Sequence, residues 1–165
     1  MGNYIDSLVD WMQGYKLDQV YLKMDEHLDE IVIRCSEIIR NAKKEIYVMI
    51  DNPLPEFVKH KGNFLISELK SKIPDVQVKL LARRHDLDYE ELKQFFPDPQ
   101  VIHYFPKEQL NGKSDSLRYD YFLIGDKNIF WGKPGFNEGI FTYNAPVLVE
   151  EVEKELNNLL VFSYQ

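Results

Sequence analysis

Strand-like and helix-like segments alternate through the first two-thirds of the chain, and this order constrains the fold more than any other feature. The run 45–50, EIYVMI, is β-branched and aromatic and is followed by Asp51-Asn52-Pro53, so it predicts a buried strand that ends in a loop. Residues 76–81 and 101–105 predict two more strands. The clearest amphipathic helix, at 25–42, carries apolar residues at three- and four-residue steps. This alternation predicts an α/β fold with a mixed, mostly parallel sheet and helices on both faces.

The last third of the chain predicts a hairpin and a final helix. Segments 117–124 and 129–131 flank a turn-like stretch at 125–128, which is typical of a β-hairpin. A further strand is expected at 140–143, and Pro146 precedes an amphipathic helix.

The opening of the chain predicts an appendage to this core. Asn3 can cap a short amphipathic helix that Gly14 ends. The whole chain has 165 residues, which is the size of one ordinary domain. We therefore expect an N-terminal helical extension at 1–19 and a single domain at 20–165.

Charge and composition predict a cytoplasmic protein without nucleic-acid or membrane partners. The formal net charge is −7, which opposes unaided binding to phosphate backbones or anionic lipid. The sequence has no apolar run of the roughly 18 residues that a membrane span needs, and no signal peptide. The single cysteine, Cys35, lies on the apolar stripe of a predicted helix, which fits a buried thiol in a reducing compartment.

Common catalytic and metal-binding motifs are missing from the sequence. It has no phosphate-binding glycine loop, HExxH, GxSxG or paired cysteines, and its four histidines share no metal-ligand spacing, so we expect no cofactor and no metal. Arg83 and Arg84 form a cationic spot in a predicted turn at a strand end. If their strand and that of Asp51 are parallel neighbours, these groups should lie close together. Asp120 alternates with apolar residues and faces either solvent or a polar pocket.

Two stretches of the sequence resemble phospholipase D-like domains. EIIRNAKKEIYVMI at 37–50 is similar to the family's helix-to-strand entry, and LRYDYFLIGDKNIFWGKPGF at 117–136 is similar to its signature hairpin. In that family a histidine and, two residues on, a lysine lead the first strand of the hairpin. These positions fall on Arg118 and Asp120, and a serine position after the second strand falls on Lys133.

The resemblance implies the fold of one phospholipase D-like half without its catalytic chemistry. Family enzymes use the imidazole as a nucleophile toward phosphorus and the lysine to hold the phosphate oxygens. Arg118 stays protonated and Asp120 repels a phosphodiester, so neither can substitute, and His-x-Lys occurs nowhere in the chain. Among non-catalytic relatives, the chain is most similar to the effector domain of TrmB-type transcription regulators, which binds a small ligand. Family members with one motif copy usually pair two subunits, which implies a homodimer.

These observations favour a non-catalytic binding or regulatory module that senses a small polar or anionic ligand in a cleft at a dimer interface. We expect no catalytic residues. The expected ligand-binding residues are Arg118, Asp120, Lys133, Arg83 and Asp51.

Two alternatives stay open at the level of sequence. The first is a phosphodiesterase or nuclease-type hydrolase with a non-standard general-base pair, either His103 with Asp120 or His85 with Asp51. The second is a structural interaction domain that docks through exposed aromatic residues. The candidates for that docking surface are Trp11, Tyr15, Phe136 and Phe141.

Overall fold

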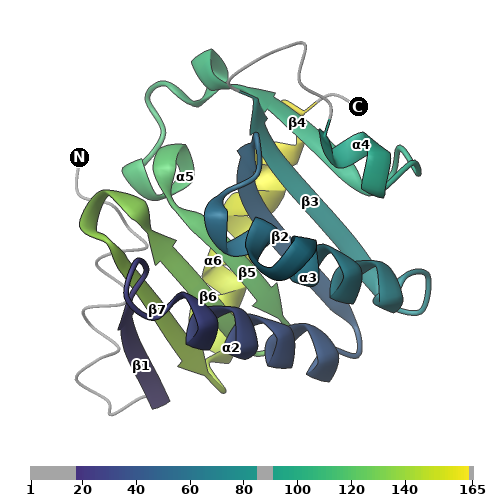
Figure 1. The fold of residues 1–165 in the computed structure, drawn as a ribbon. Coiled ribbons are helices and arrows are strands. Elements are labelled where there is room, and N and C mark those ends of the chain that lie inside the picture. The colour runs from purple at the N-terminus through teal and green to yellow at the C-terminus, as the bar shows by residue number, and fades with distance from the viewer. Residues whose placement is uncertain (1–17, 85–90, 164–165) are drawn as a thin grey trace.

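The chain forms one seven-stranded mixed sheet in the strand order β1-β7-β6-β5-β2-β3-β4 (Figure 1). The structure, a computed structural model, describes residues 18–84 and 91–163. The strands are β1 (Asp18–Lys23), β2 (Glu45–Asn52), β3 (Gln77–Arg84), β4 (Ile102–Pro106), β5 (Tyr121–Gly125), β6 (Asn128–Lys133) and β7 (Glu138–Tyr143). The helices are α2 (Leu28–Asn41), α3 (Glu56–Lys72), α4 (Glu91–Phe95), α5 (Asp115–Tyr119) and α6 (Pro146–Leu160), with short 3-10 turns η1 (Lys107–Leu110) and η2 (Pro134–Phe136).

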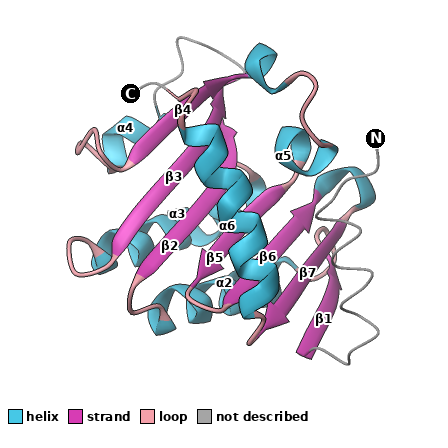
Figure 2. Ribbon diagram, turned by 180° about the vertical axis from the view of Figure 1, so that it is seen from behind, coloured by secondary structure: helices cyan, strands magenta, loops and turns pink. Residues whose placement is uncertain are grey.

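Helices cover both faces of the sheet, which confirms the α/β prediction. Helices α2 and α3 lie on one face, and α6 crosses the other, as the two opposite views in Figures 1 and 2 show. The parallel part of the sheet consists of β2, β3 and β4. The other described pairs, β1 with β7, β7 with β6, β6 with β5 and β5 with β2, are antiparallel. The sheet is therefore mixed as expected, but antiparallel pairs outnumber parallel ones.

Apolar side chains form two separate cores, one on each side of the sheet. The first packs α2 and α3 against residues such as Ile46 and Phe130, and the second packs α6 against residues such as Met49 and Phe122. Alternate residues of a buried strand supply alternate cores, which is why EIYVMI reads as a continuous apolar run. Cys35 belongs to the first core and is fully buried as expected, and this burial raises the pKa of its thiol well above the ordinary value.

Two local predictions need correction. The segment that opens the expected hairpin strand is instead the short helix α5, so the strand itself begins only at Tyr121. Arg83 and Arg84 do not form an exposed turn, because β3 continues through both and both are buried. Helix α3 is interrupted near Gly62, since residues 60–63 leave the helical conformation.

The N-terminal extension expected at 1–19 lies almost wholly outside the described residues, and the boundary at residue 20 stays a prediction. No helix within 18–84 and 91–163 is both long and apolar enough to cross a membrane.

Candidate functional site at one edge of the sheet

The pairing of the strands brings the expected site residues to one edge of the sheet. Parallel pairing places Asp51 directly opposite Arg83 at the ends of β2 and β3. Antiparallel pairing of β2 with β5 puts the start of β5, and with it Asp120, beside the end of β2. Gly132 lies opposite Tyr121, so Lys133 reaches the same edge at the end of β6. The prediction that the ends of β2 and β3 lie close together is therefore confirmed.

Asp51 and Arg83 form a partly buried ion pair at this edge. Arg83 Nε donates to Asp51 Oδ1 at 2.7 Å, and the Arg83 side chain is 1% exposed. Arg83 Nη1 donates to the Leu117 carbonyl oxygen in α5 at 3.1 Å. The pair thus ties two parallel strands to the helix that carries Arg118, and its guanidinium donates to acceptors from two elements, β2 and α5.

Tyr121 completes this network from β5. Its hydroxyl donates to Asp51 Oδ2 at 3.1 Å, and the centre of its ring lies 5.5 Å from the Arg83 guanidinium carbon. Burial, followed by the charge of Asp51, raises the pKa of Tyr121 far above its ordinary range. The hydroxyl therefore stays protonated and acts as a hydrogen-bond donor. Sequence reasoning missed this residue, because a tyrosine that begins a strand carries no signal of its own.

Asp120 is buried beside Trp131, a residue of the second core. It follows the last residue of α5, it is buried, and its Oδ2 accepts a hydrogen bond from Trp131 Nε1 at 2.7 Å. Lys133 Nζ lies 5.0 Å from the centre of the Trp131 ring and 5.4 Å from that of Phe136. Asp120 and Lys133 therefore contact the same indole, one through its N–H and the other over its face.

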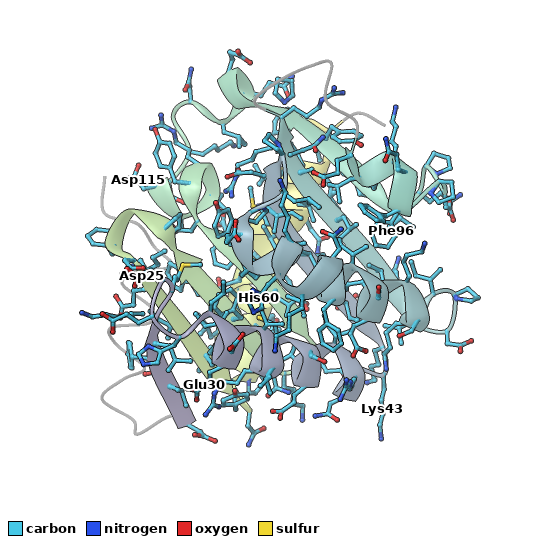
Figure 3. The ribbon with its side chains drawn as sticks, in the orientation of Figure 1. Asp25, Glu30, Lys43, His60, Phe96 and Asp115 are labelled. Atoms are coloured by element: carbon cyan, nitrogen blue, oxygen red, sulfur yellow. The ribbon has the colours of Figure 1, made fainter. Side chains whose placement is uncertain are left out.

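Arg118 lies at the outer side of this edge, in α5. Its Nη2 donates to the Tyr119 hydroxyl at 2.8 Å, and its Nη1 lies 3.9 Å from Oδ1 of the exposed Asp115, which Figure 3 labels. Arg118 follows Leu117 in the chain, and the carbonyl oxygen of Leu117 accepts a hydrogen bond from Arg83. Arg118 is therefore next in sequence to a residue that contacts the ion pair. The five expected residues are thus gathered at one place in the fold, although the part of each in binding stays a prediction.

The alternative hydrolase pairs do not find support in this arrangement. His103 lies on β4, which is separated from β5 by β2 and β3, so it is roughly 14 Å from Asp120 at ordinary strand spacing. Its Nδ1 instead lies 3.5 Å from the Ser163 hydroxyl, and burial lowers its pKa. His85 lies outside the described residues. Across 18–84 and 91–163, no group of three or more histidine, cysteine or acidic side chains could hold a metal ion.

The aromatic residues expected for protein docking differ in their exposure. Phe136 is 76% exposed, whereas Phe141 is fully buried in the first core, so Phe141 cannot serve as a docking residue. Trp11 and Tyr15 lie outside the described residues.

Comparison of the fold with solved structures identifies similar proteins, whereas comparison of the sequence does not. No protein-family model matches the chain, and no curated protein matches it significantly. TrmBL2, described as an archaeal chromatin protein with a novel mode of DNA binding, is similar with a TM-score of 0.62 and 13% identity over 96% of this chain and 59% of that one.

Two further structures are similar to this chain. Phosphatidylserine synthase of Haemophilus influenzae has a TM-score of 0.57 and 18% identity over 86% of this chain and 37% of that one. NucT from Helicobacter pylori has a TM-score of 0.62 and 10% identity over 89% of this chain and 98% of that one. These likenesses confirm a phospholipase D-like fold with a TrmB-like protein among its neighbours.

One expectation about partners was wrong. The acidic net charge suggested that the chain has no direct contact with nucleic acid, yet a protein with this fold, TrmBL2, is described as binding DNA. The error lies in the premise, because net charge is a sum over the whole surface while binding depends on the local arrangement of charges and on the fold that presents them.

Proposed function

We propose that this chain is a binding or regulatory module on a phospholipase D-like scaffold and not a phosphodiester hydrolase. One observation carries the proposal: both carboxylates expected at the ligand-binding edge are bound to internal partners. Asp51 holds Arg83 at 2.7 Å, and Asp120 accepts from Trp131 at 2.7 Å. A phosphate site needs cations where Asp120 stands, and Arg118 cannot replace the imidazole that attacks phosphorus in the family's enzymes.

The ligand-binding residues that we propose are those gathered at this edge, namely Arg118, Asp120, Lys133, Arg83 and Asp51. Arg118 and Lys133 are partly exposed, so they are the groups that a small polar or anionic ligand would meet first. The ion pair between Arg83 and Asp51 would lie beneath them and hold the edge in one geometry. A binding site held in this way loses little conformational entropy when its ligand arrives.

A second part of the proposal is that two copies pair at this edge, as the resemblance implies. Support comes from the two exposed aromatic side chains there, Tyr119 at 46% and Phe136 at 76% exposure. Light scattering should give the mass of a dimer, and Phe136→Ser should shift it toward the monomer. Phe162→Ser is a matched control, because Phe162 is also exposed but follows α6. A monomeric wild-type protein would contradict pairing. We place the protein in the cytoplasm, in accord with its buried single thiol.

Two measurements test the main proposal. Bis(p-nitrophenyl) phosphate should show no turnover above background. Titration with inorganic phosphate, sugar phosphates and nucleotides should reveal binding that Lys133→Gln weakens. Lys127→Gln is the matched control, since Lys127 is exposed in the turn between β5 and β6 at the opposite end of these strands. Enzyme-like hydrolysis that Asp120→Asn abolishes would show that the chain is an enzyme and would refute the proposal.

A further inference from the structure

A groove of about 450 Å³ opens beside the Asp51 network on the face that α2 and α3 cover. It lies between the N-terminal ends of these two helices and the turn that follows β6. Its walls are mostly apolar and include Met24, Leu28, Pro55, Phe57 and Pro134. A ligand that fills the groove must therefore have an apolar body, because a small ion would leave the apolar walls in contact with water.

The charged residues that line this groove are both acidic. They are Asp25 and Glu56, and no lysine or arginine is among the described residues of its lining. Asn137 fixes the position of Asp25: it donates from Nδ2 to Asp25 Oδ1 at 2.6 Å, and its own Oδ1 accepts from the Asp25 backbone N–H at 3.0 Å. Figure 3 labels Asp25 at the side of the molecule. An anion would meet repulsion from both carboxylates, while a cation would be attracted.

Two aromatic rings add flat apolar surface to the groove. The centres of the Phe57 and Tyr121 rings lie 5.6 Å apart with their planes tilted by 45°. The hydrogen bond from Tyr121 to Asp51 keeps its ring in this position. Because the Arg83 guanidinium carbon already lies 5.5 Å from the centre of the Tyr121 ring, the rings suit an aromatic body better than a second cation.

A purely structural role, stabilisation of a helix N-terminus, accounts for only one of the two acidic residues. Glu56 lies in the first turn of α3, where a negative charge stabilises the helix dipole. Asp25 precedes α2 by three positions and is held by Asn137 rather than by helix N–H groups. Neither fact explains why apolar walls, two aromatic rings and two carboxylates face one cavity.

We propose that this groove binds a small organic cation with an ammonium group and an apolar, preferably aromatic, body. The apolar part would fill the space between Met24, Leu28 and Pro134. The ammonium group would lie near Glu56 and Asp25, and the aromatic body would pack beside the rings of Phe57 and Tyr121. This inference goes beyond the proposed function, since the groove is lined by none of the five residues placed at the ligand-binding edge.

Methyl NMR on protein with isotope-labelled methionine tests the proposal directly. Met24 lines the groove, whereas Met49 is buried in the second core on the opposite face of the sheet, so one signal reports binding and the other is the internal reference. Benzyltrimethylammonium should shift the Met24 signal and leave that of Met49 in place. Its uncharged isostere neopentylbenzene should cause a weaker shift, and benzenesulfonate should cause none.

Charge variants separate specific binding from general attraction to an acidic protein. Glu56→Gln and Asp25→Asn should each lower the affinity for benzyltrimethylammonium by about two- to fivefold, the range expected for one partly exposed charge pair. Glu26→Gln removes the same charge from the neighbouring position outside the groove lining, and it should leave the affinity unchanged.

Three outcomes would overturn the proposal. The first is an unshifted Met24 signal at the solubility limit of benzyltrimethylammonium. The second is an equal response to neopentylbenzene or benzenesulfonate, and the third is an equal effect of Glu26→Gln and Glu56→Gln. None of these outcomes bears on phosphodiester hydrolysis or on Lys133, so failure here is distinguishable from failure of the proposed function.

Discussion

Replacement of Asp51 by asparagine measures how much the partly buried ion pair contributes to stability. Asparagine keeps the shape of the side chain and an oxygen that can accept from Arg83 Nε, but it removes the charge. Arg83 is 1% exposed and Asp51 is 23% exposed. Loss of one partner of a fully buried pair costs about 3–5 kcal/mol, and loss of an exposed one costs about 0–1 kcal/mol. Because water reaches Asp51, we expect Asp51→Asn to lower the free energy of unfolding by about 2–3 kcal/mol.

Urea unfolding at neutral pH, followed by circular dichroism, checks this value. The melting temperature should fall by roughly 5–10 °C for a chain of this size. Glu30→Gln is the matched control, since Glu30 pairs with Arg34 at 3.1 Å but the two side chains are 45% and 28% exposed. That variant should cost less than about 1 kcal/mol. If Asp51→Asn were no more destabilising than Glu30→Gln, the reasoning that Arg83 needs Asp51 for its burial would be refuted.

Two further variants test other parts of the fold. Burial, followed by the charge of Glu45, raises the pKa of Glu153 from 4.5 to about 7. The free energy of unfolding should therefore fall as the pH rises from about 4.5 to 7. Glu153→Gln should raise the free energy of unfolding by about 1 kcal/mol above pH 7 and leave it unchanged at pH 4. Glu150→Gln, at an exposed site, should show no such pH dependence. Gly125→Ala should lower the free energy of unfolding in urea by about 1–3 kcal/mol, because its Cβ would lie 2.8 Å from a carbonyl oxygen of α2. Gly135→Ala is the control and should be nearly neutral, because its Cβ meets nothing within 4 Å. Equal effects of the two alanine variants, or a pH-independent Glu153→Gln, would contradict these interpretations.

The sequence predicts the order of elements well, because burial imposes a period on the apolar residues. Helix α2 and strand β2 follow from the patterns at 25–42 and 45–50. Their junction is one of the two stretches that resemble phospholipase D-like domains. The meeting of Asp51 with Arg83 was also predictable, since parallel neighbours end at the same edge of a sheet. These features depend on local pattern and on one topological rule.

The details that decide the site depend on tertiary contacts, and the sequence does not show them. The five residues of α5 alternate like a strand, and their helical form accompanies a hydrogen bond from Arg83 to the Leu117 carbonyl oxygen. The burial of Arg83 likewise requires acceptors from β2 and α5 together. The groove could not be foreseen either, because Met24, Phe57 and Tyr121 are far apart in the chain and meet only when the sheet is assembled.

Side chains at the positions that align with the motif of phospholipase D-like enzymes contribute to the geometry of this edge. A carboxylate at position 120 would repel a phosphodiester, yet the same carboxylate holds Trp131, and Trp131 in turn lies under the ammonium group of Lys133. At the neighbouring strand, Asp51 holds both the Arg83 guanidinium and the hydroxyl of Tyr121. Charged groups that have hydrogen-bond partners within the protein hold their neighbours in place at small entropic cost when a ligand binds. Under the proposed function, these contacts would give the edge a pre-ordered geometry for a ligand.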